Sequence, residues 1–418
     1  MRRLLHFGIP FLLSALLCLW GCGATPKDHK TAAQLLGNPA YKAISYGGYR
    51  QTSREQQPTI SEIKEDLRLL HAIGIRILRT YNLQFDFASN VLQAIDDLHK
   101  DEEAFEMHVM LGAWINCENA WTATPNHAEE DEVNNASEIQ KAVALAKAYP
   151  HLVKIIAVGN EAMVHWATPY FVHPRVVLKW VNHLQQLKND GELPKELWIT
   201  SSDDFASWGG GDASYHIPEL NALMEAVDFV SMHTYPFHNT HYTPEYWAQD
   251  PATVQDKSKE KQIEAAMDRA LAFAVTQVNN VKQYMDKLGI DKPIHIGETG
   301  WASHDNGLYG KDGSQAADEY KQGLYYQRIT QWTETNGMSC FYFEAFDEIW
   351  KDSANPKGSE NHFGLFTVDG KAKYPLWKIA DQGVFKGIGR YQQAVTKTYQ
   401  GELNALMQNV SPPKTTSQ

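Results

Sequence analysis

Short apolar runs rich in β-branched and aromatic residues recur along the chain, and more polar segments separate them. Runs of this length, bounded by glycine, proline or polar residues, are typical of buried strands. There are eight of them: AISYGGY (43–49), IRILRTY (75–81), EMHVMLGAW (106–114), VKIIAVGNE (153–161), LWITSSD (197–203), VDFVSMHTY (227–235), IHIGETGW (294–301) and MSCFYFEAF (338–346).

Most of the segments between the runs carry apolar residues at helical spacing. Clear examples are 61–74, which ends at a glycine, 136–150, which ends at a proline, and 260–289, which ends at a glycine. Parallel strands need crossover helices, and eight such units can close on themselves. We therefore predict an α/β fold, a single-domain (β/α)₈ (TIM) barrel. The rival, a doubly wound open sheet, needs a glycine-rich phosphate loop after an early strand, and YGGY lacks that fingerprint.

Composition narrows the class of function. The chain has 418 residues, of which 43% are hydrophobic and 21% charged, so it can bury a sizeable core and is unlike a disordered chain. Its net charge is −12 and it has no long basic run, so the electrostatic footprint of nucleic-acid binding is missing. We expect no nucleic-acid partner.

The first 22 residues have the layout of an export signal, with two arginines, an apolar core and a small residue before a cysteine. Their end, LWGC, resembles a bacterial lipobox, in which the cysteine, here Cys22, becomes the lipidated first residue. We expect an exported lipoprotein of the bacterial cell envelope, and Gly23 after the cysteine favours the outer membrane. A periplasmic or secreted protein and an uncleaved anchor are the alternatives. The predicted parts are a signal peptide (1–22), a polar tether (23–40), the barrel (41–390) and a C-terminal extension (391–418).

Polar residues at the ends of the apolar runs are the candidates for chemistry, because barrels of this kind place their active residues at the carboxyl ends of the strands. Glu161 ends the fourth run and Glu298 lies near the end of the seventh. Two carboxylates facing one cleft are what glycoside hydrolysis needs, one to protonate the departing oxygen and one to attack or to activate water. Either glutamate alone would more simply cap a helix or pair with an arginine such as Arg79. Their occurrence at matching strand ends favours catalysis.

Three segments around these positions resemble the signature segments of glycoside hydrolase family 17, the β-1,3-glucanases and glucanosyltransferases of clan A. They are IAVGNEA (156–162), IGETGWAS (296–303) and FEAFDEIWK (343–351). The segments ISYGGYR and IRILRTYN fit the same family and are closer to its bacterial and fungal branches than to the plant enzymes. The resemblance spans about residues 43 to 380.

The resemblance implies roles for individual residues. Glu161 matches the acid/base and Glu298 the nucleophile of a double displacement that retains the anomeric configuration. Asn160 would then bind the sugar 2-hydroxyl, and Tyr235 would donate a hydrogen bond to the nucleophile. His233 stands where the plant enzymes more often have asparagine, and a structural role for it is equally compatible with the sequence.

Further candidates are expected to bind substrate. Glu348 and Lys351 match a charged pair near the family's substrate site, with a surface ion pair as the alternative. Aromatic rings stack on the apolar faces of sugars, so rings at strand ends are expected subsite walls, with the core as the alternative. These rings are Tyr46, Tyr81, Trp301 and Trp350. A second group, equally compatible with the core, is Trp114, Trp121, Trp166, Trp208 and Trp247.

No metal or cofactor is expected. His238 and His241 have no acidic partner close in sequence, and the acidic segment 127–135 lacks the pattern of a calcium loop and is predicted to start a helix. Cys117 and Cys340 match no zinc motif and are predicted to be buried free thiols.

The sequence thus predicts a retaining hydrolase, expected to be monomeric, that cleaves internal β-1,3-glucosidic bonds of a β-glucan polysaccharide or oligosaccharide. A glucanosyltransferase with the same site is the first alternative, and a non-catalytic glucan-binding lipoprotein is the second. Paired carboxylates argue against the latter, because a binding surface needs aromatic rings but no such pair.

Overall fold

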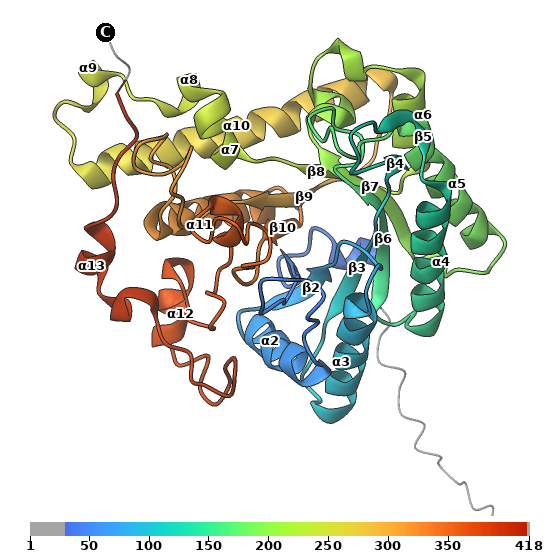
Figure 1. Ribbon diagram of the computed structural model, residues 1–418, viewed down its shortest axis with the longest axis horizontal. Helices are drawn as coiled ribbons and strands as arrows, with labels where there is room; N and C mark the ends of the chain where they lie inside the picture. Colours follow the sequence, from blue (N-terminus) through green and yellow to red (C-terminus); the bar gives the residue numbers. More distant parts are fainter. Residues whose placement is uncertain (1–29, 416–418) are drawn as a thin grey trace, which may run out of the picture. The chain divides into compact units, whose positions relative to one another are not determined.

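The computed structural model describes residues 30–415 (Figure 1). The predicted signal peptide and Cys22 lie outside the described residues. Within the part that the structure describes, no helix has the length and apolar character that would let it cross a membrane.

Eight parallel strands form a closed barrel, which confirms the predicted (β/α)₈ architecture. Around the barrel their order is β1, β10, β9, β8, β7, β6, β3, β2. Each coincides with one of the eight apolar runs, and only β1 and β7 extend one residue beyond theirs. The strands are β1 (Lys42–Ser45), β2 (Ile75–Arg79), β3 (His108–Ala113), β6 (Val153–Asn160), β7 (Trp198–Asp204), β8 (Val230–His233), β9 (Ile294–Gly300) and β10 (Cys340–Phe343).

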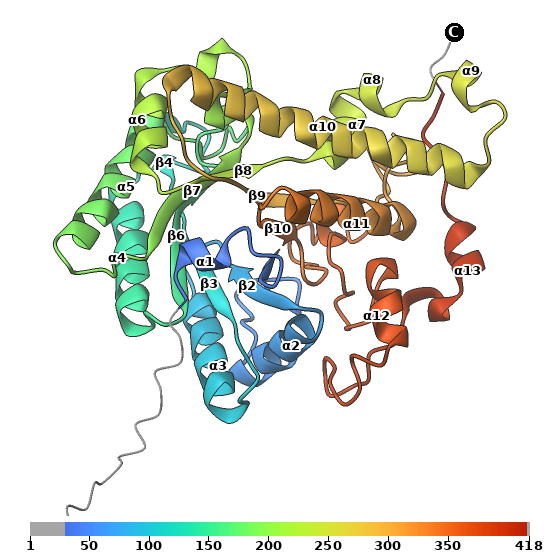
Figure 2. The ribbon, with the colours of Figure 1, turned by 180° about the vertical axis from the view of Figure 1, so that it is seen from behind.

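Helices connect the strands and cover the outside of the barrel (Figures 1 and 2). The main ones are α2 (Ile60–Ala72), α3 (Phe87–Asp101), α4 (Glu132–Ala148), α5 (Pro174–Asn189), α6 (Pro218–Ala226), α10 (Lys259–Leu288) and α11 (Glu319–Thr335). Local sequence fixes their ends. Thr59 and Glu62 form a capping box at the start of α2, and Gly289, with a φ of 72°, ends α10 in the left-handed conformation that glycine adopts readily. Shorter helices are α7 (Pro236–Tyr242), α8 (Pro244–Trp247), α9 (Pro251–Val254), α12 (Trp377–Asp381) and α13 (Leu403–Met407).

A short helix, α1 (Ala32–Leu35), lies against the end of the barrel at which the strands begin, and Figure 2 shows it beside β2 and β3. Ala32 and Leu35 are buried and join the barrel interior, where they meet strand residues such as Ile77, Ile155 and Phe341. The predicted tether over 23–40 is therefore wrong from residue 31 onwards. The apolar residues of α1 bury their surface in the open end of the barrel, which is favourable for any apolar side chain.

A two-stranded hairpin follows β3 and consists of β4 (Cys117–Glu118) and β5 (Asn126–Glu130), which are antiparallel. The helix predicted to start within 127–135 begins only at Glu132, and the residues before it pair as β5. The sequence did not predict this strand, because the acidic residues of the segment leave no alternation of apolar and polar positions. Cys117 in β4 and Cys340 in β10 are buried free thiols, as predicted.

The predicted C-terminal extension packs on the barrel unit as far as the structure describes it. Just before it, Arg390 donates two hydrogen bonds to the buried carboxylate of Asp66 on α2, at 2.9 and 2.8 Å. Near the end of the chain, the backbone N–H of Gln249 donates to the carbonyl of Lys414 at 3.0 Å. These contacts attach the extension to the fold.

Two of the barrel strands contain an extra residue close to a glycine. Along β6, Ala157 pairs with Thr200 but Asn160 pairs with Ser202, so three steps on β6 match two on β7. Along β9, Ile296 pairs with Met232 and Glu298 with His233, so two steps match one on β8. Such bulges re-aim the side chains that follow them. At Gly297 a Cβ atom would lie 2.1 Å from Ser231 Oγ, so only glycine fits there.

Candidate active site

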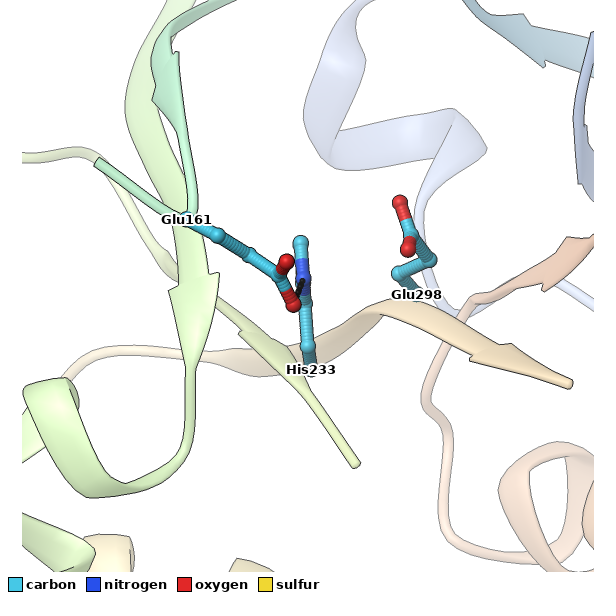
Figure 3. Close-up of side chains that lie close together, drawn as sticks. All are labelled: Glu161, His233 and Glu298. Carbon is cyan, nitrogen blue, oxygen red and sulfur yellow. Dashed lines mark hydrogen bonds and ion pairs between the residues drawn. The ribbon is translucent and has the colours of Figure 1, made fainter. Parts of the chain in front are cut away.

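The strand ends bring Glu161, His233 and Glu298 together. Glu161 follows β6 directly, His233 ends β8, and Glu298 lies in β9. One carboxylate oxygen of each glutamate and one ring nitrogen of His233 lie within 4.8 Å of one another. Figure 3 shows the histidine ring between the two carboxylates. The two glutamates, which are far apart in the sequence, therefore lie close together.

Glu298 is surrounded by hydrogen-bond donors. Arg79 Nη1 donates to its Oε2 at 2.8 Å, and Tyr81 Oη donates to the same oxygen at 2.7 Å. Tyr235 Oη donates to Oε1 at 2.5 Å. A carboxylate that accepts bonds from a guanidinium and two phenols is held in its ionised form and in one orientation.

Glu161 has fewer donors around it. His233 Nδ1 lies 3.0 Å from Glu161 Oε1, and the Glu161 backbone has a φ of 47° and donates its N–H to the carbonyl of Ser202. The chain beyond it is fixed by Asp203, whose carboxylate accepts from the backbone N–H of Met163 at 2.8 Å. The side chain of Glu161 is thus directed to the cleft by its backbone and by one imidazole.

These surroundings separate the pKa values of the two carboxyls. Burial raises the pKa of Glu161 well above its usual value, and the negative charge of Glu298 raises it further. Burial also acts to raise the pKa of Glu298, but the charge of Arg79 and the hydrogen bonds from Tyr235 and Tyr81 oppose it, and this pKa lies below its usual value. Burial lowers the pKa of His233 to about 4, so at pH 7 the ring is neutral and Arg79 supplies the positive charge.

Among the described residues, Glu161, His233 and Glu298 form the one acidic and histidine cluster with spacing suited to a metal ion. Arg79 Nη1 lies 2.8 Å from Glu298 Oε2 and 3.2 Å from His233 Nε2. A cation in this cluster would face a fixed positive charge at close range, which is unfavourable. The donor set is therefore a poor metal site.

A pocket of about 660 Å³ lies against Glu298 and Asn160. It is within the range of small-ligand sites, about 300–1,000 Å³. Arg79 Nη2 donates to Asn160 Oδ1 at 2.5 Å, which leaves the Asn160 amide N–H₂ to face the pocket. Aromatic rings on its wall include Tyr46, Tyr81, Trp114, Trp121, Phe343 and Trp350.

The loop after β10 contributes a buried ionic cluster to the pocket. Lys351 Nζ lies 2.8 Å from Glu344 Oε2 and 3.1 Å from Glu348 Oε2, and both carboxylates are almost fully buried. Burial raises the pKa of Glu344 well above its usual value. The alternative of a surface ion pair for Glu348 and Lys351 is therefore wrong. Glu348 Oε1 and Trp350 Nε1 are buried and have no hydrogen-bond partner among the described residues.

A model of the BtgE/BtgC glycoside hydrolase domain matches residues 43–364. The chain belongs to this glycoside hydrolase family. The hydrolase is similar to an endo-laminarinase from Formosa Hel1_33_131, with 58% identity, a TM-score of 0.91 and coverage of 93% of this chain and 99% of that chain.

Two further matches are more distant. The probable glucan endo-1,3-beta-glucosidase btgC of Aspergillus terreus (strain NIH 2624 / FGSC A1156) is 23% identical over 380 residues, which cover 86% of this chain and 49% of that protein. The hydrolase thus spans about half the length of that relative. A glycoside hydrolase family 17 β-1,3-glucanosyltransferase from Rhizomucor miehei shares the fold, with 19% identity and a TM-score of 0.52 over 79% of this chain and 94% of that chain.

One aromatic prediction in the hydrolase is wrong, and the contacts of two others are now defined. Trp301 does not line the pocket: its ring is fully buried, its Nε1 donates to the carbonyl of Ala316 at 2.8 Å, and it packs against Phe237 and Trp247. Tyr46 lies on the pocket wall but is buried, and its hydroxyl donates to Asp66. Tyr81 was expected to stack on a sugar ring. Its hydroxyl donates a hydrogen bond to Glu298.

The sequence alone did not assign two site residues. Arg79 was considered only as an arginine that could form an ion pair with a glutamate. Its place near the end of the IRILRTY run could have indicated that it belongs to the site. Glu344 also went unrecognised, although it lies in the FEAF segment after the last strand. Of the remaining candidates, Asn160, Glu348, Trp350 and Lys351 lie on the pocket wall, and Tyr235 contacts Glu298.

Proposed function

We propose that this hydrolase cleaves internal β-1,3-glucosidic bonds of laminarin-type β-glucan by double displacement with retention. The observation that carries the proposal is the spacing of the carboxylates, with one oxygen of Glu161 within 4.8 Å of one oxygen of Glu298. Retaining pairs stand about 5–5.5 Å apart, whereas inverting pairs need about 6.5–9.5 Å to admit a water molecule. The bond and substrate follow from the likeness to a laminarinase at 58% identity.

In the first step, Glu298 attacks the anomeric carbon. It is suited to this because Arg79, Tyr81 and Tyr235 keep it ionised and fix its orientation. A glycosyl–enzyme ester forms between Glu298 and the sugar as the glycosidic C–O bond breaks. The other half of the glucan leaves with a proton from Glu161.

His233 determines where the proton of Glu161 sits. Ser202 Oγ lies 2.8 Å from His233 Nε2, and Arg79 Nη1, which can only donate, lies 3.2 Å from it. A ring N–H pointing at the guanidinium would be unfavourable, so we assign the ring proton to Nδ1 and let Nε2 accept. Nδ1–H then donates to Glu161 Oε1, which leaves the carboxyl proton on Oε2. Glu161 therefore donates its proton to the departing oxygen from one defined atom, Oε2.

In the second step, Glu161 has lost its proton and acts as the base. It takes a proton from water, which attacks the anomeric carbon and releases Glu298. Because both steps invert, the configuration is retained overall. The Asn160 amide N–H₂ is placed to donate to the sugar 2-hydroxyl throughout.

The pocket wall supports an uncharged, hydroxyl-rich ligand. Glu348 Oε1 is an acceptor and Trp350 Nε1 a donor, and both are buried without a partner. Buried polar groups are nearly always satisfied, so groups left open on a pocket wall favour a ligand that supplies both donors and acceptors. Sugar hydroxyls do so.

Product analysis tests the proposal. The protein is incubated with linear laminarin and with laminarihexaose, and the products are followed by mass spectrometry and by anomeric proton NMR. We expect a range of shorter β-1,3-oligosaccharides that appear first as the β-anomer. The α-anomer as first product would exclude retention, and glucose as sole product would exclude internal cleavage. Products longer than laminarihexaose would show that a sugar replaces water in the second step, as in a glucanosyltransferase.

A further inference from the structure

The β4–β5 hairpin is joined by backbone hydrogen bonds to the segment that follows Glu161. Cys117 N–H donates to the carbonyl of Tyr170 at 3.1 Å, and Trp121 N–H donates to the carbonyl of Pro169 at 2.8 Å. On the other strand, the His127 carbonyl accepts from His173 N–H at 2.9 Å. The hairpin and the acid/base loop therefore form one rigid unit beside the pocket.

The turn of this hairpin presents Trp121 in a strained conformation. Trp121 has a φ of 65°, and Asn119 two residues earlier has a φ of 57°. Positive φ is unfavourable for a bulky residue and persists only where its surroundings hold it in place. Here the hydrogen bond to Pro169 holds the backbone, and the result is a side chain fixed outside the core.

The Trp121 ring is largely exposed but supported on one face. Its side chain is 61% exposed although it lines the pocket, whereas Trp208, Trp247 and Trp301 are buried. The Tyr170 ring stacks against it at 4.9 Å with an interplanar angle of 24°. Trp114 packs on Tyr170 in turn, at 5.2 Å. Tyr170, which is itself held by Trp114, thus supports one face of Trp121, and most of the Trp121 surface stays exposed.

We propose that Trp121, supported by Tyr170, forms a further glucosyl subsite of the cleft, apart from the carboxylates. An aromatic face with a rigid support binds the flat C–H face of a pyranose ring at little cost in conformational entropy. The contacts of Trp121 are with Tyr170 and Pro169 and not with the carboxylates, so we assign it to a neighbouring sugar of the bound chain. The subsite therefore matters only to chains long enough to reach it. This inference rests on the proposed function.

The test compares Trp121→Ala, Trp121→Phe and the parent protein on laminaritriose, laminaripentaose, laminariheptaose and laminarin. We expect Trp121→Ala to lower kcat/KM for laminarin by about tenfold and to leave that for the shortest cleaved substrate unchanged. Trp121→Phe should recover most of the loss, because it keeps an aromatic face. The control is Tyr399→Ala, an aromatic residue that is 39% exposed, has a φ of 50° and lies on another part of the surface. It should have no effect.

Two results would overturn the subsite. An equal loss on all chain lengths would mean that Trp121 only supports the acid/base loop, and no loss on any length would mean that it binds nothing. If the parent protein cleaved none of these glucans, the proposed function would fail separately. Calorimetry of laminariheptaose binding to the parent and Trp121→Ala proteins would then decide on the subsite, since equal affinities would exclude it.

Discussion

Glu161 and Glu298 are the same residue type, both near a bulge in a parallel strand and both close to His233, yet their neighbours differ. Glu298 accepts hydrogen bonds from one guanidinium and two phenols, and its pKa is low. Glu161 meets one neutral imidazole and a facing negative charge, and its pKa is high. The difference shows that the donors around a carboxyl decide whether it serves as nucleophile or as acid.

Replacing the nucleophile should have the largest effect. We expect Glu298→Gln to lower kcat on laminarin by about four orders of magnitude or more, because the covalent step is lost. Sodium azide added to Glu298→Ala should give the α-glycosyl azide, since azide can enter the space that the shortened side chain leaves and attacks once. The product is identified by NMR. The surface variant Glu192→Gln, which lies in an exposed ion pair, is the matched control and should keep full activity.

Replacing the acid/base should have a smaller and substrate-dependent effect. We expect Glu161→Gln to lower kcat on laminarin by about 10²–10⁴-fold. Its first step should stay fast on an aryl β-laminaribioside with a dinitrophenol leaving group, because that group departs without a proton. Azide should then attack the glycosyl enzyme without a base and give the β-glycosyl azide. A β-azide from Glu298→Ala and an α-azide from Glu161→Gln would reverse the two roles.

Changing the pKa values of the two carboxyls should shift the pH dependence of kcat/KM. Activity requires Glu298 ionised and Glu161 protonated, so the acid limb of kcat/KM follows the pKa of Glu298 and the alkaline limb that of Glu161. Arg79 lowers both pKa values. Arg79→Gln should therefore move both limbs to higher pH, with a modest loss at the optimum, and Arg79→Lys should move them less.

The control for this shift is Arg328→Gln, which removes a guanidinium from α11 that pairs with Asp268 outside the site. Its pH profile should match that of the parent protein. An Arg79→Gln profile that keeps both limbs in place would show that the two phenols, and not the guanidinium, hold Glu298 in its ionised form.

Much of the fold and the two neighbouring glutamates could be predicted from the sequence, because apolar runs and strand-end carboxylates are local signals. Trp301 was predicted to line the cleft because it lies three residues after Glu298. Distance along the chain does not determine the direction of a side chain beyond a strand end, and this ring is buried in the core. The hairpin and α1 were missed because each is short, and α1 is buried only through contacts with distant strands. The role of Cys22 in export stays a prediction.

The bulges of β6 and β9 change which side chains face the cleft and which face the helices. Val158 and Ile296 point to the helix layer, so in regular strands Asn160 and Glu298, two positions later, would also point there. The extra residue at each glycine reverses the alternation and turns both side chains to the cleft. If β9 kept these residues but followed the regular alternation, the side chain of Glu298 would be buried among apolar residues, although the glutamate itself would be unchanged. The orientation of both glutamate-bearing strand ends depends on these bulges as well as on the residue types.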